Sequence, residues 1–205
     1  MPDDPDIQLV EAAQSGDYPA FESLVKKHEA RVHRLAMRIV RQRQDAEEVV
    51  QQTFLSVLEH LGEFRRESVF TTWLLRIATN HGLALLRRRA SRPTVSMDSP
   101  SDDDSPSRPE FVAEWRQAPE EIAEDRETRQ VLTQVLDELD LKYSLVFVLR
   151  DLEGFSIQET AETLHISEDN VKVRLLRARL MLRERLARRF GIEDSTEGEV
   201  PNKAV

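Results

Sequence analysis

The side chains best suited to a chemical role in this sequence are the cations near its C-terminal end. Residues 171–190 carry eight lysines and arginines but a single acid, Glu184. Clustered cations bind the phosphates of nucleic acids, because each neutralised phosphate releases a condensed counterion. The net charge of the whole chain is −9, which alone argues against such binding. The segregation of charge is more informative than its total, and it favours a nucleic-acid interface.

Two helix-start signals position these cations. Ser156 and Glu159 form a capping box that opens one helix, and Ser167 opens a second helix after a turn at His165. His165 stands where glycine often takes a positive φ, which histidine tolerates at modest cost. In the second helix an apolar stripe faces the core: Val171, Leu175, Ala178 and Leu182. The cations are left outward or flanking: Lys172, Arg174, Arg177 and Arg179.

This pattern predicts a helix-turn-helix, whose second helix enters the major groove of DNA. A plain helical hairpin with a solvated basic face has the same periodicity and stays open as an alternative. No pattern predicts a catalytic centre. The five histidines lack metal-ligand spacing, the chain has no cysteine, and no glycine-rich phosphate loop is present. We therefore expect a binding protein and no enzyme, with no catalytic residue, no metal and no cofactor.

The elements that hold these groups are predicted to be helices. Aromatic residues make up 6% of the chain and Gly only 6 residues, which disfavours β-sandwiches and barrels. Apolar residues recur at helical spacing in residues 6–92 and again in residues 119–190. Residues 93–118 are rich in serine and aspartate and predict a flexible acidic linker, and residues 191–205 a flexible tail. The predicted fold class is all-α, with two small helical domains joined by that linker.

Within the first domain, Asp45 is expected to cap a helix in a box with Glu48, and another helix is expected from about residue 71 to residue 89. No stretch of the sequence approaches the roughly 18 apolar residues of a membrane-spanning helix. The first residues are acidic, where a secretory signal is basic and then apolar. We therefore expect no membrane insertion and a cytoplasmic protein.

Both predicted domains resemble parts of a known family, the extracytoplasmic-function sigma factors of bacterial RNA polymerase. The second domain is similar to sigma region 4 in Ser156-x-x-Glu159-x-Ala161-x-x-Leu164-x-Ile166-Ser167 and in Val171-Lys172-x-Arg174-Leu175-x-Arg177-Ala178-Arg179. The first domain is similar to sigma region 2 in Asp45-Ala46-Glu47-Glu48-Val49-x-Gln51-x-Thr53-Phe54-Leu55 and in Phe70-x-Thr72-Trp73-Leu74-x-Arg76-Ile77-Ala78-x-Asn80. The resemblance implies a sigma factor, which binds core polymerase and directs promoter recognition and DNA opening.

The resemblance also implies where each partner binds. Core polymerase offers its clamp and flap surfaces, and the residues expected at the clamp are Asp45, Glu47, Glu48, Gln51, Gln52 and Phe54. Promoter opening and the downstream element are expected to involve Phe64, Arg65, Arg66, Phe70, Asn80, Arg87, Arg88 and Arg89. The upstream element is expected to be read by Lys172, Val173, Arg174, Leu176, Arg177 and Arg179. Purely structural roles compete with these: helix capping for the acids of residues 45–48, and core packing for Phe70, Trp73 and Ile77. Of the last three we expect Trp73 and Ile77 to be core residues.

Further expectations concern regulation and the linker. An anti-sigma protein is the expected regulator, and the domains of the free protein are expected to pack together and cover their DNA-binding surfaces. The acidic linker either mimics nucleic-acid charge in a polymerase channel or is a plain tether, and the sequence favours neither. The alternative function is a stand-alone helix-turn-helix transcriptional regulator. Such a regulator carries a receiver or ligand-binding domain, usually α/β, in front, whereas the first block here reads as helical.

Overall fold

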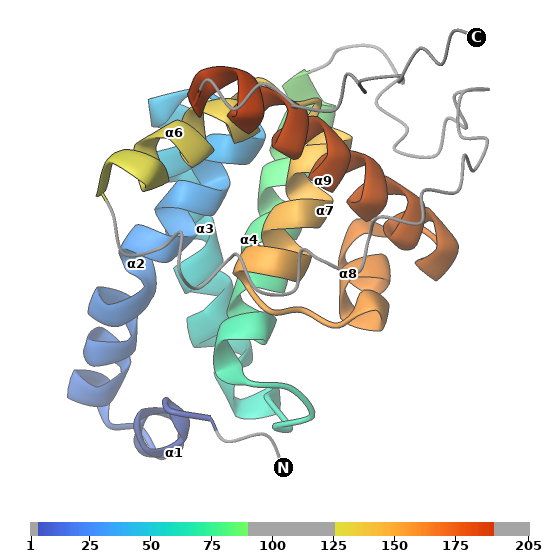
Figure 1. Ribbon diagram of the computed structural model, residues 1–205. Coiled ribbons are helices and arrows are strands. Elements are labelled where there is room, and N and C mark those ends of the chain that lie inside the picture. The colour runs from blue at the N-terminus through green and yellow to red at the C-terminus, as the bar shows by residue number, and fades with distance from the viewer. Residues whose placement is uncertain (1–3, 90–125, 191–205) are drawn as a thin grey trace, which may run out of the picture.

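The computed structural model describes residues 4–89 and 126–190. Both parts are helical, and no strand occurs among these residues (Figure 1). The predicted linker at 93–118 and the predicted tail at 191–205 lie outside the described residues, as do the two predicted domain edges at residues 92 and 119. The all-α fold class predicted from composition and periodicity is confirmed.

The first domain is a bundle of long helices. In chain order its elements are α1 (Ile7–Gln14), α2 (Tyr18–Val40), α3 (Arg43–His60), the short 3-10 turn η1 (Leu61–Glu63) and α4 (Phe70–Arg89). Helices α2, α3 and α4 pack on one another, and α1 packs on α2 (Figure 1). Helix α2 buries one apolar side chain every three or four positions, including Leu24, Val32, Leu35 and Ile39. Burial of that stripe against α3 and α4 forms the core.

A glycine sets the distance between α2 and α4. Gly82 of α4 is buried, and a Cβ atom at this position would lie only 3.0 Å from the Ile39 side chain of α2. The two backbones approach this closely because Gly82 has no side chain. The close approach lets α4 pack directly against α2 in the first domain.

One predicted helix boundary is wrong. Helix α3 begins at Arg43 with Gln42 at the capping position, so Asp45 lies in the first turn and forms no capping box with Glu48. The Asp45 carboxylate is buried and paired with Arg89 at the end of α4, so it does not act as a cap. Tertiary packing thus decides the start of the helix. The predicted helix near residues 71–89 is confirmed as α4, which begins one residue earlier.

The second domain packs shorter helices around one long helix. Its elements are α6 (Arg126–Asp137), α7 (Leu141–Phe147), the π-helical segment η3 (Val148–Leu152), α8 (Ile157–Leu164) and α9 (Glu168–Phe190). Helix α9 packs on α6, α7 and α8. Its stripe of Val171, Leu175, Ala178 and Leu182 is buried, as predicted from spacing.

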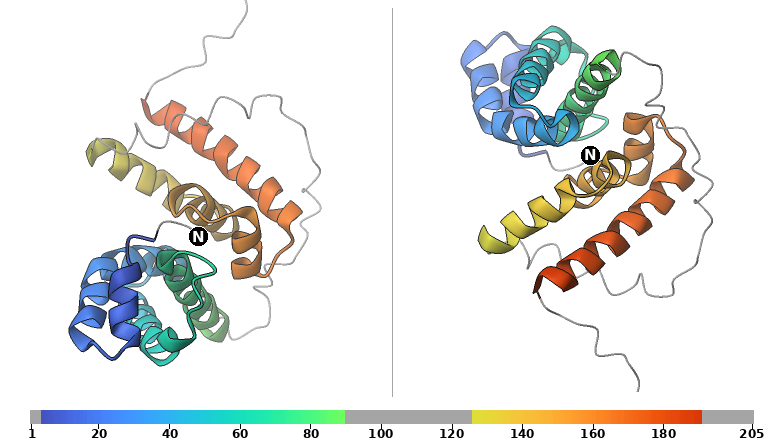
Figure 2. Two further views of the ribbon diagram at one scale, coloured as in Figure 1. Left: turned by 90° about the horizontal axis from the view of Figure 1, so that it is seen from below. Right: turned by 90° about the horizontal axis from the view of Figure 1, so that it is seen from above.

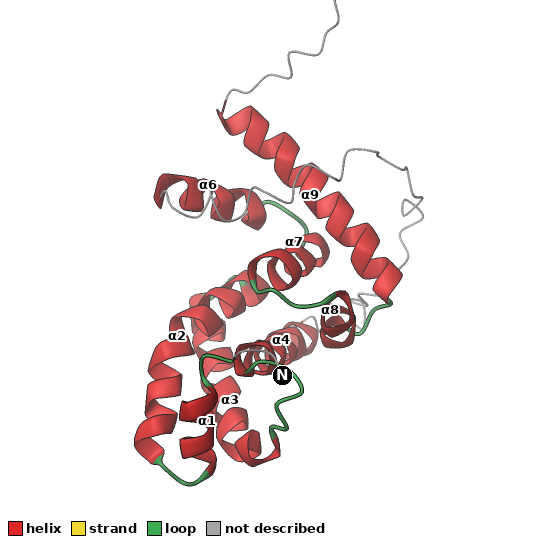
Figure 3. Ribbon diagram, turned by 60° about the horizontal axis from the view of Figure 1, so that its bottom comes forward, coloured by secondary structure: helices red, strands yellow, loops and turns green. Residues whose placement is uncertain are grey.

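The two domains pack against each other. Helix α2 contacts α7, and α4 contacts α8. Helix α9 lies on the outer side of the second domain, away from α2, α3 and α4 (Figures 2 and 3). The domains therefore pack together as expected, but the expectation that their DNA-binding surfaces are covered fails for α9, because α6, α7 and α8 stand between this helix and the first domain.

Candidate functional site

The helix-turn-helix has the local geometry predicted from its caps. The Glu159 backbone N–H donates to the Ser156 hydroxyl at 3.1 Å, and the Glu159 carboxylate accepts from the Ser156 backbone N–H at 2.7 Å. His165 ends α8 with φ 54°, the left-handed conformation. The Ser167 hydroxyl accepts a hydrogen bond from the Asn170 backbone N–H at 3.2 Å and opens α9. These caps fix the angle at which α9 leaves the turn.

The cations of α9 differ in exposure, and one prediction fails. Lys172 is exposed beside Asp169, and a hydrogen bond from Lys172 to that carboxylate raises the pKa of the ammonium group. Arg174, expected to lie on the outward or flanking side of α9, is only 3% exposed. Its position explains this, because residue 174 follows Val171 by three and precedes Ala178 by four and so shares their buried face.

Two further predicted cations lie on the flank of α9 and have partners within the domain. Arg179 forms a two-pronged ion pair with Asp151 of η3, with both N–O distances 2.8 Å. Arg177 lies 3.4 Å from the Tyr143 hydroxyl of α7. Val173 and Leu176 are half-buried. The exposed cations of α9 are therefore Lys172 near its start and, further along, Arg183, Arg188 and Arg189.

A groove between α2 and α3 forms the second candidate surface. Apolar side chains line it, and three of them are well exposed: Tyr18 at 67%, Leu58 at 49% and Leu55 at 45%. Three of the residues predicted for clamp docking also line the groove: Glu47, Gln51 and Phe54. Gln52 is exposed on the same helix. The sequence analysis did not identify Tyr18 and Leu58 as surface residues, because apolar residues at helical spacing are expected to be buried in the core.

Two predicted docking acids face elsewhere. Asp45 was expected among the exposed acids, but its side chain is 3% exposed and paired with Arg89 at the end of α4. Glu48 lies 3.9 Å from Arg88, the neighbouring cation. The expectation that Asp45 is exposed is wrong, because the start of α3 packs beside the end of α4, which the sequence does not reveal. Arg87, Arg88 and Arg89 are exposed, so the end of α4 presents a cluster of cations that α3 partly neutralises.

The loop at residues 64–69 forms the third candidate surface. Phe64 and Phe70, predicted to be available for stacking on bases, are 6% and 0% exposed and belong to the core. Phe64 packs on Trp73 with ring centroids 5.2 Å apart, and Phe70 packs 6.0 Å from both rings. Trp73 and Ile77 are partly buried against the core, as expected. The sequence reveals the aromatic cluster but not which member keeps an open face, and that member is Trp73.

This loop borders a polar cleft against α8 of the second domain. Arg65 is exposed there, and the cleft is also lined by Trp73, Arg76, Glu159 and Glu162. Arg76 pairs with Glu162, and hydrogen bonds from Gln158 and then Arg76 lower the pKa of the Glu162 carboxyl. Asn80 lies further along α4 and is half-buried. The predicted promoter-opening residues thus cluster only in part, with the loop at one end of α4 and the cations at the other.

Within the described ranges, no three histidine, cysteine or carboxylate side chains lie close enough to hold a metal ion. Over the same ranges, no helix has the length and apolar character needed to cross a bilayer.

Comparisons with known proteins agree with this geometry. Residues 24–92 match the family model of Sigma-70 region 2, and residues 129–182 match that of Sigma-70, region 4. RNA polymerase sigma-H factor of Pseudomonas aeruginosa is 33% identical over 174 residues, which cover 85% of this chain and 90% of that protein. ECF RNA polymerase sigma factor SigM of Mycobacterium tuberculosis (strain H37Rv) is 34% identical over 186 residues, 91% of this chain and 85% of that one.

Solved structures show the same fold. CnrH in complex with the cytosolic domain of CnrY superposes with a TM-score of 0.57 at 28% identity, covering 90% of this chain and 99% of that chain. RpoE of Bartonella quintana, in complex with the anti-sigma factor NepR, gives a TM-score of 0.55 at 20% identity over 81% and 96% of the two chains.

The chain belongs to the sigma-70 family, and within it to the extracytoplasmic-function sigma factors. It is an RNA polymerase sigma factor for transcription initiation, with region 2 in the first domain and region 4 in the second. The alternative of a stand-alone regulator is not supported, because the residues in front of the helix-turn-helix domain match a sigma region.

Proposed function

We propose that this sigma factor docks on the clamp of core polymerase mainly through the groove between α2 and α3. The observation that carries the proposal is the exposure of large apolar side chains there, with Leu55 and Leu58 nearly half exposed. Exposed apolar clusters rimmed by polar groups mark protein interfaces. Glu47 and Gln51 supply that rim. The flap surface is the expected partner of the second domain.

We further propose that the loop at 64–69 and the end of α4 open the promoter. Arg65 and Arg66 supply charge in the loop, Asn80 supplies a polar side chain on α4, and Trp73 is the aromatic with an open face. Opening a duplex costs a few kcal/mol per unstacked base step, which stacking and charge offset. Phe64 and Phe70 serve this step as the buried floor of the loop. Arg87, Arg88 and Arg89 hold the upstream backbone.

Reading of the upstream promoter element belongs to α9 in this proposal. Lys172 and Val173 occupy the first turns of the helix, which meet base edges in helix-turn-helix complexes. Leu176, Arg177 and Arg179 lie on its flank, with the arginines available to phosphates once their present partners are exchanged. Arg174, being buried, holds α9 on its own domain.

The regulator and the cellular location of this protein are proposed from its relatives. The similar structures include RpoE bound to the anti-sigma factor NepR, and an anti-sigma partner is proposed for this chain as well. The protein is proposed to act in the cytoplasm, where polymerase works, as two functional domains at 6–92 and 119–190 with a linker between them. The catalytic chemistry then belongs to the polymerase, and this subunit contributes binding.

The docking proposal is tested with two arginine substitutions in the first domain. Leu55→Arg places a charge in the groove, whereas Ser23→Arg adds the same group at an exposed position of α2 outside the groove. The Kd for core polymerase, measured with fluorescently labelled protein, should rise about tenfold or more for Leu55→Arg, as at an interface hot spot. For Ser23→Arg it should change less than about threefold. Equal effects of the two variants would contradict the groove as the docking site.

A further inference from the structure

The start of the chain holds both ends of the loop at 64–69. The Gln14 side chain of α1 donates to the Leu61 carbonyl at 2.8 Å and to the Phe64 carbonyl at 3.3 Å, where the loop begins. At the other end, the Asp4 carboxylate accepts a hydrogen bond from the Phe70 backbone N–H at 2.7 Å. Asp4 thereby satisfies one of the free N–H groups in the first turn of α4.

The middle of the loop is held by α1 as well. Arg66 pairs with Glu11 at 2.6 Å and takes a positive φ of 61°. A non-glycine residue in this region of φ is strained by roughly 1–2 kcal/mol and persists only when neighbouring contacts fix it. Three residues of the segment 4–14, Asp4, Glu11 and Gln14, therefore contact one short loop.

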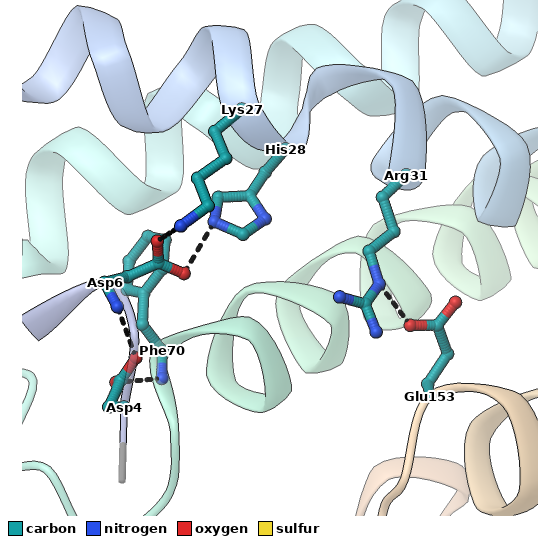
Figure 4. Close-up of polar contacts among 7 residues, drawn as sticks. All are labelled: Asp4, Asp6, Lys27, His28, Arg31, Phe70 and Glu153. Atoms are coloured by element: carbon teal, nitrogen blue, oxygen red, sulfur yellow. Dashed lines mark hydrogen bonds and ion pairs between the residues drawn. The ribbon is translucent and has the colours of Figure 1, made fainter.

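The segment that holds the loop is itself fixed to α2 (Figure 4). The second oxygen of Asp4 accepts from the Asp6 backbone N–H at 2.9 Å. The Asp6 carboxylate is buried, bonded to the His28 ring at 2.8 Å and paired with Lys27. Burial lowers the pKa of His28, and its ring also packs 5.6 Å from that of Phe70. A continuous chain of contacts thus runs from α2 through Asp6 and Asp4 to the start of α4.

We propose that residues 4–14 form a brace that positions the loop at 64–69 for capture of the opened DNA strand, with Asp4, Glu11 and Gln14 as positioning residues. The inference rests on the proposed function, which assigns this loop to promoter opening. A loop that is ordered before DNA arrives avoids the entropic cost of ordering at the opening step. The brace residues line neither the groove between α2 and α3 nor the surface of α9. The brace therefore acts on opening and leaves core binding unchanged.

The test compares two templates that differ only in whether the DNA must be opened. Asp4→Ala and Gln14→Ala are assayed with core polymerase on a duplex promoter and on the same promoter with a premelted bubble. Asp17→Ala is the matched control, because it removes a similar carboxylate bond, to the Ala20 backbone N–H at 3.2 Å, from α2. Initiation on the duplex should fall about fivefold for the brace variants, which corresponds to about 1 kcal/mol at the opening step. On the bubble it should stay within about twofold of the unchanged protein, as should the control on both templates.

The outcomes separate the brace from the proposed function. Equal loss on duplex and bubble, or no loss on the duplex, overturns the brace while the unchanged protein still initiates. Absence of initiation by the unchanged protein on either template overturns the proposed function and the brace with it.

A second measurement needs no polymerase. The chain has two tryptophans, and Trp115→Phe leaves Trp73, which packs on Phe64, as the sole reporter of the loop. Acrylamide should quench Trp73 fluorescence more strongly in Asp4→Ala than in Asp17→Ala, because the released loop exposes the ring. Equal quenching in these two variants shows that the start of the chain does not hold the loop, and overturns the proposal.

Discussion

At the scale of single residues, the ion pairs of this protein differ in burial. Arg179 and Asp151 form a paired, largely buried contact, with the Asp151 side chain 9% exposed. Glu184 and Arg188 of the same helix form a solvated pair, both more than 60% exposed. The first kind of pair holds η3 to α9, while the second kind contributes little to stability.

Substitution of one acid from each pair should separate the two kinds. Asp151→Asn leaves the Arg179 guanidinium without its charged partner and should lower the free energy of unfolding by about 2 kcal/mol. Glu184→Gln, the control in α9, should change it by less than about 0.5 kcal/mol. Urea unfolding followed by circular dichroism measures both values. Similar small losses for the two variants would show that burial of the Asp151 pair adds nothing.

The residue scale also shows what a sequence can and cannot predict. The caps Ser156 and Ser167 and the positive φ at His165 follow from local chemistry, and the structure confirms them. Arg174 and Asp45 could not be placed by residue type, since charged residues are usually exposed. Burial of Arg174 is nevertheless detectable from its spacing to Val171 and Ala178. Burial of Asp45 depends on the end of α4, which is distant in the sequence, and has no local signal.

At the scale of elements, the helices were predictable and their contacts were not. Periodicity located α3, α4, α8 and α9 because each buries one continuous stripe. The contact between α2 and α4 depends on Gly82, which sequence reasoning passed over as one glycine in a helix. Sequence reasoning identified the groove between α2 and α3 mainly by its polar residues. Its apolar residues recur at the spacing of buried residues and were therefore expected to lie in the core.

The close contact at Gly82 gives a prediction about stability. Gly82→Ala places a methyl group about 3.0 Å from Ile39 and should destabilise the protein by about 1–3 kcal/mol, the usual cost of overpacking. Gly62→Ala is the matched control, since nothing lies within 4 Å of the added atom. Its thermal midpoint should stay level or rise slightly. Equal thermal midpoints for Gly82→Ala and Gly62→Ala, measured by scanning calorimetry, would show that the contact between α2 and α4 accommodates a methyl group without loss of stability.

At the scale of the whole molecule, the interface between the domains is electrostatically one-sided. The first domain contributes arginines, and the second contributes acids or carbonyls: Arg31 pairs with Glu153 and Arg76 with Glu162. Arg38 lies 3.3 Å from Asp137, and burial lowers the pKa of its guanidinium. Exposed pairs such as Arg76 with Glu162 are individually weak and sensitive to salt. We therefore expect the ion pairs to hold the two domains together less strongly at high salt.

Charge reversal at this interface gives a prediction about how the two domains are held together. Glu153→Arg together with Glu162→Arg replaces two attractions by repulsions, so the radius of gyration from small-angle scattering should increase. Glu22→Arg together with Glu184→Arg is the control with the same charge change, because these acids pair with Lys26 and Arg188 of their own helices and, among the described residues, with no cation of the other domain. The control should match the unchanged protein. An unchanged radius for the interface variant would show that apolar contacts alone close the molecule.

The measurement that tests the central claim most directly is the mapping of transcript start sites. Core polymerase is incubated with a genomic promoter library, with and without the protein, and the 5′ ends of the transcripts are sequenced. The protein should create new start sites that share an upstream motif, and Lys172→Ala should weaken them while leaving core binding intact. A stable complex that adds no start site, or the same start sites with and without the protein, would contradict its assignment as a promoter-directing subunit.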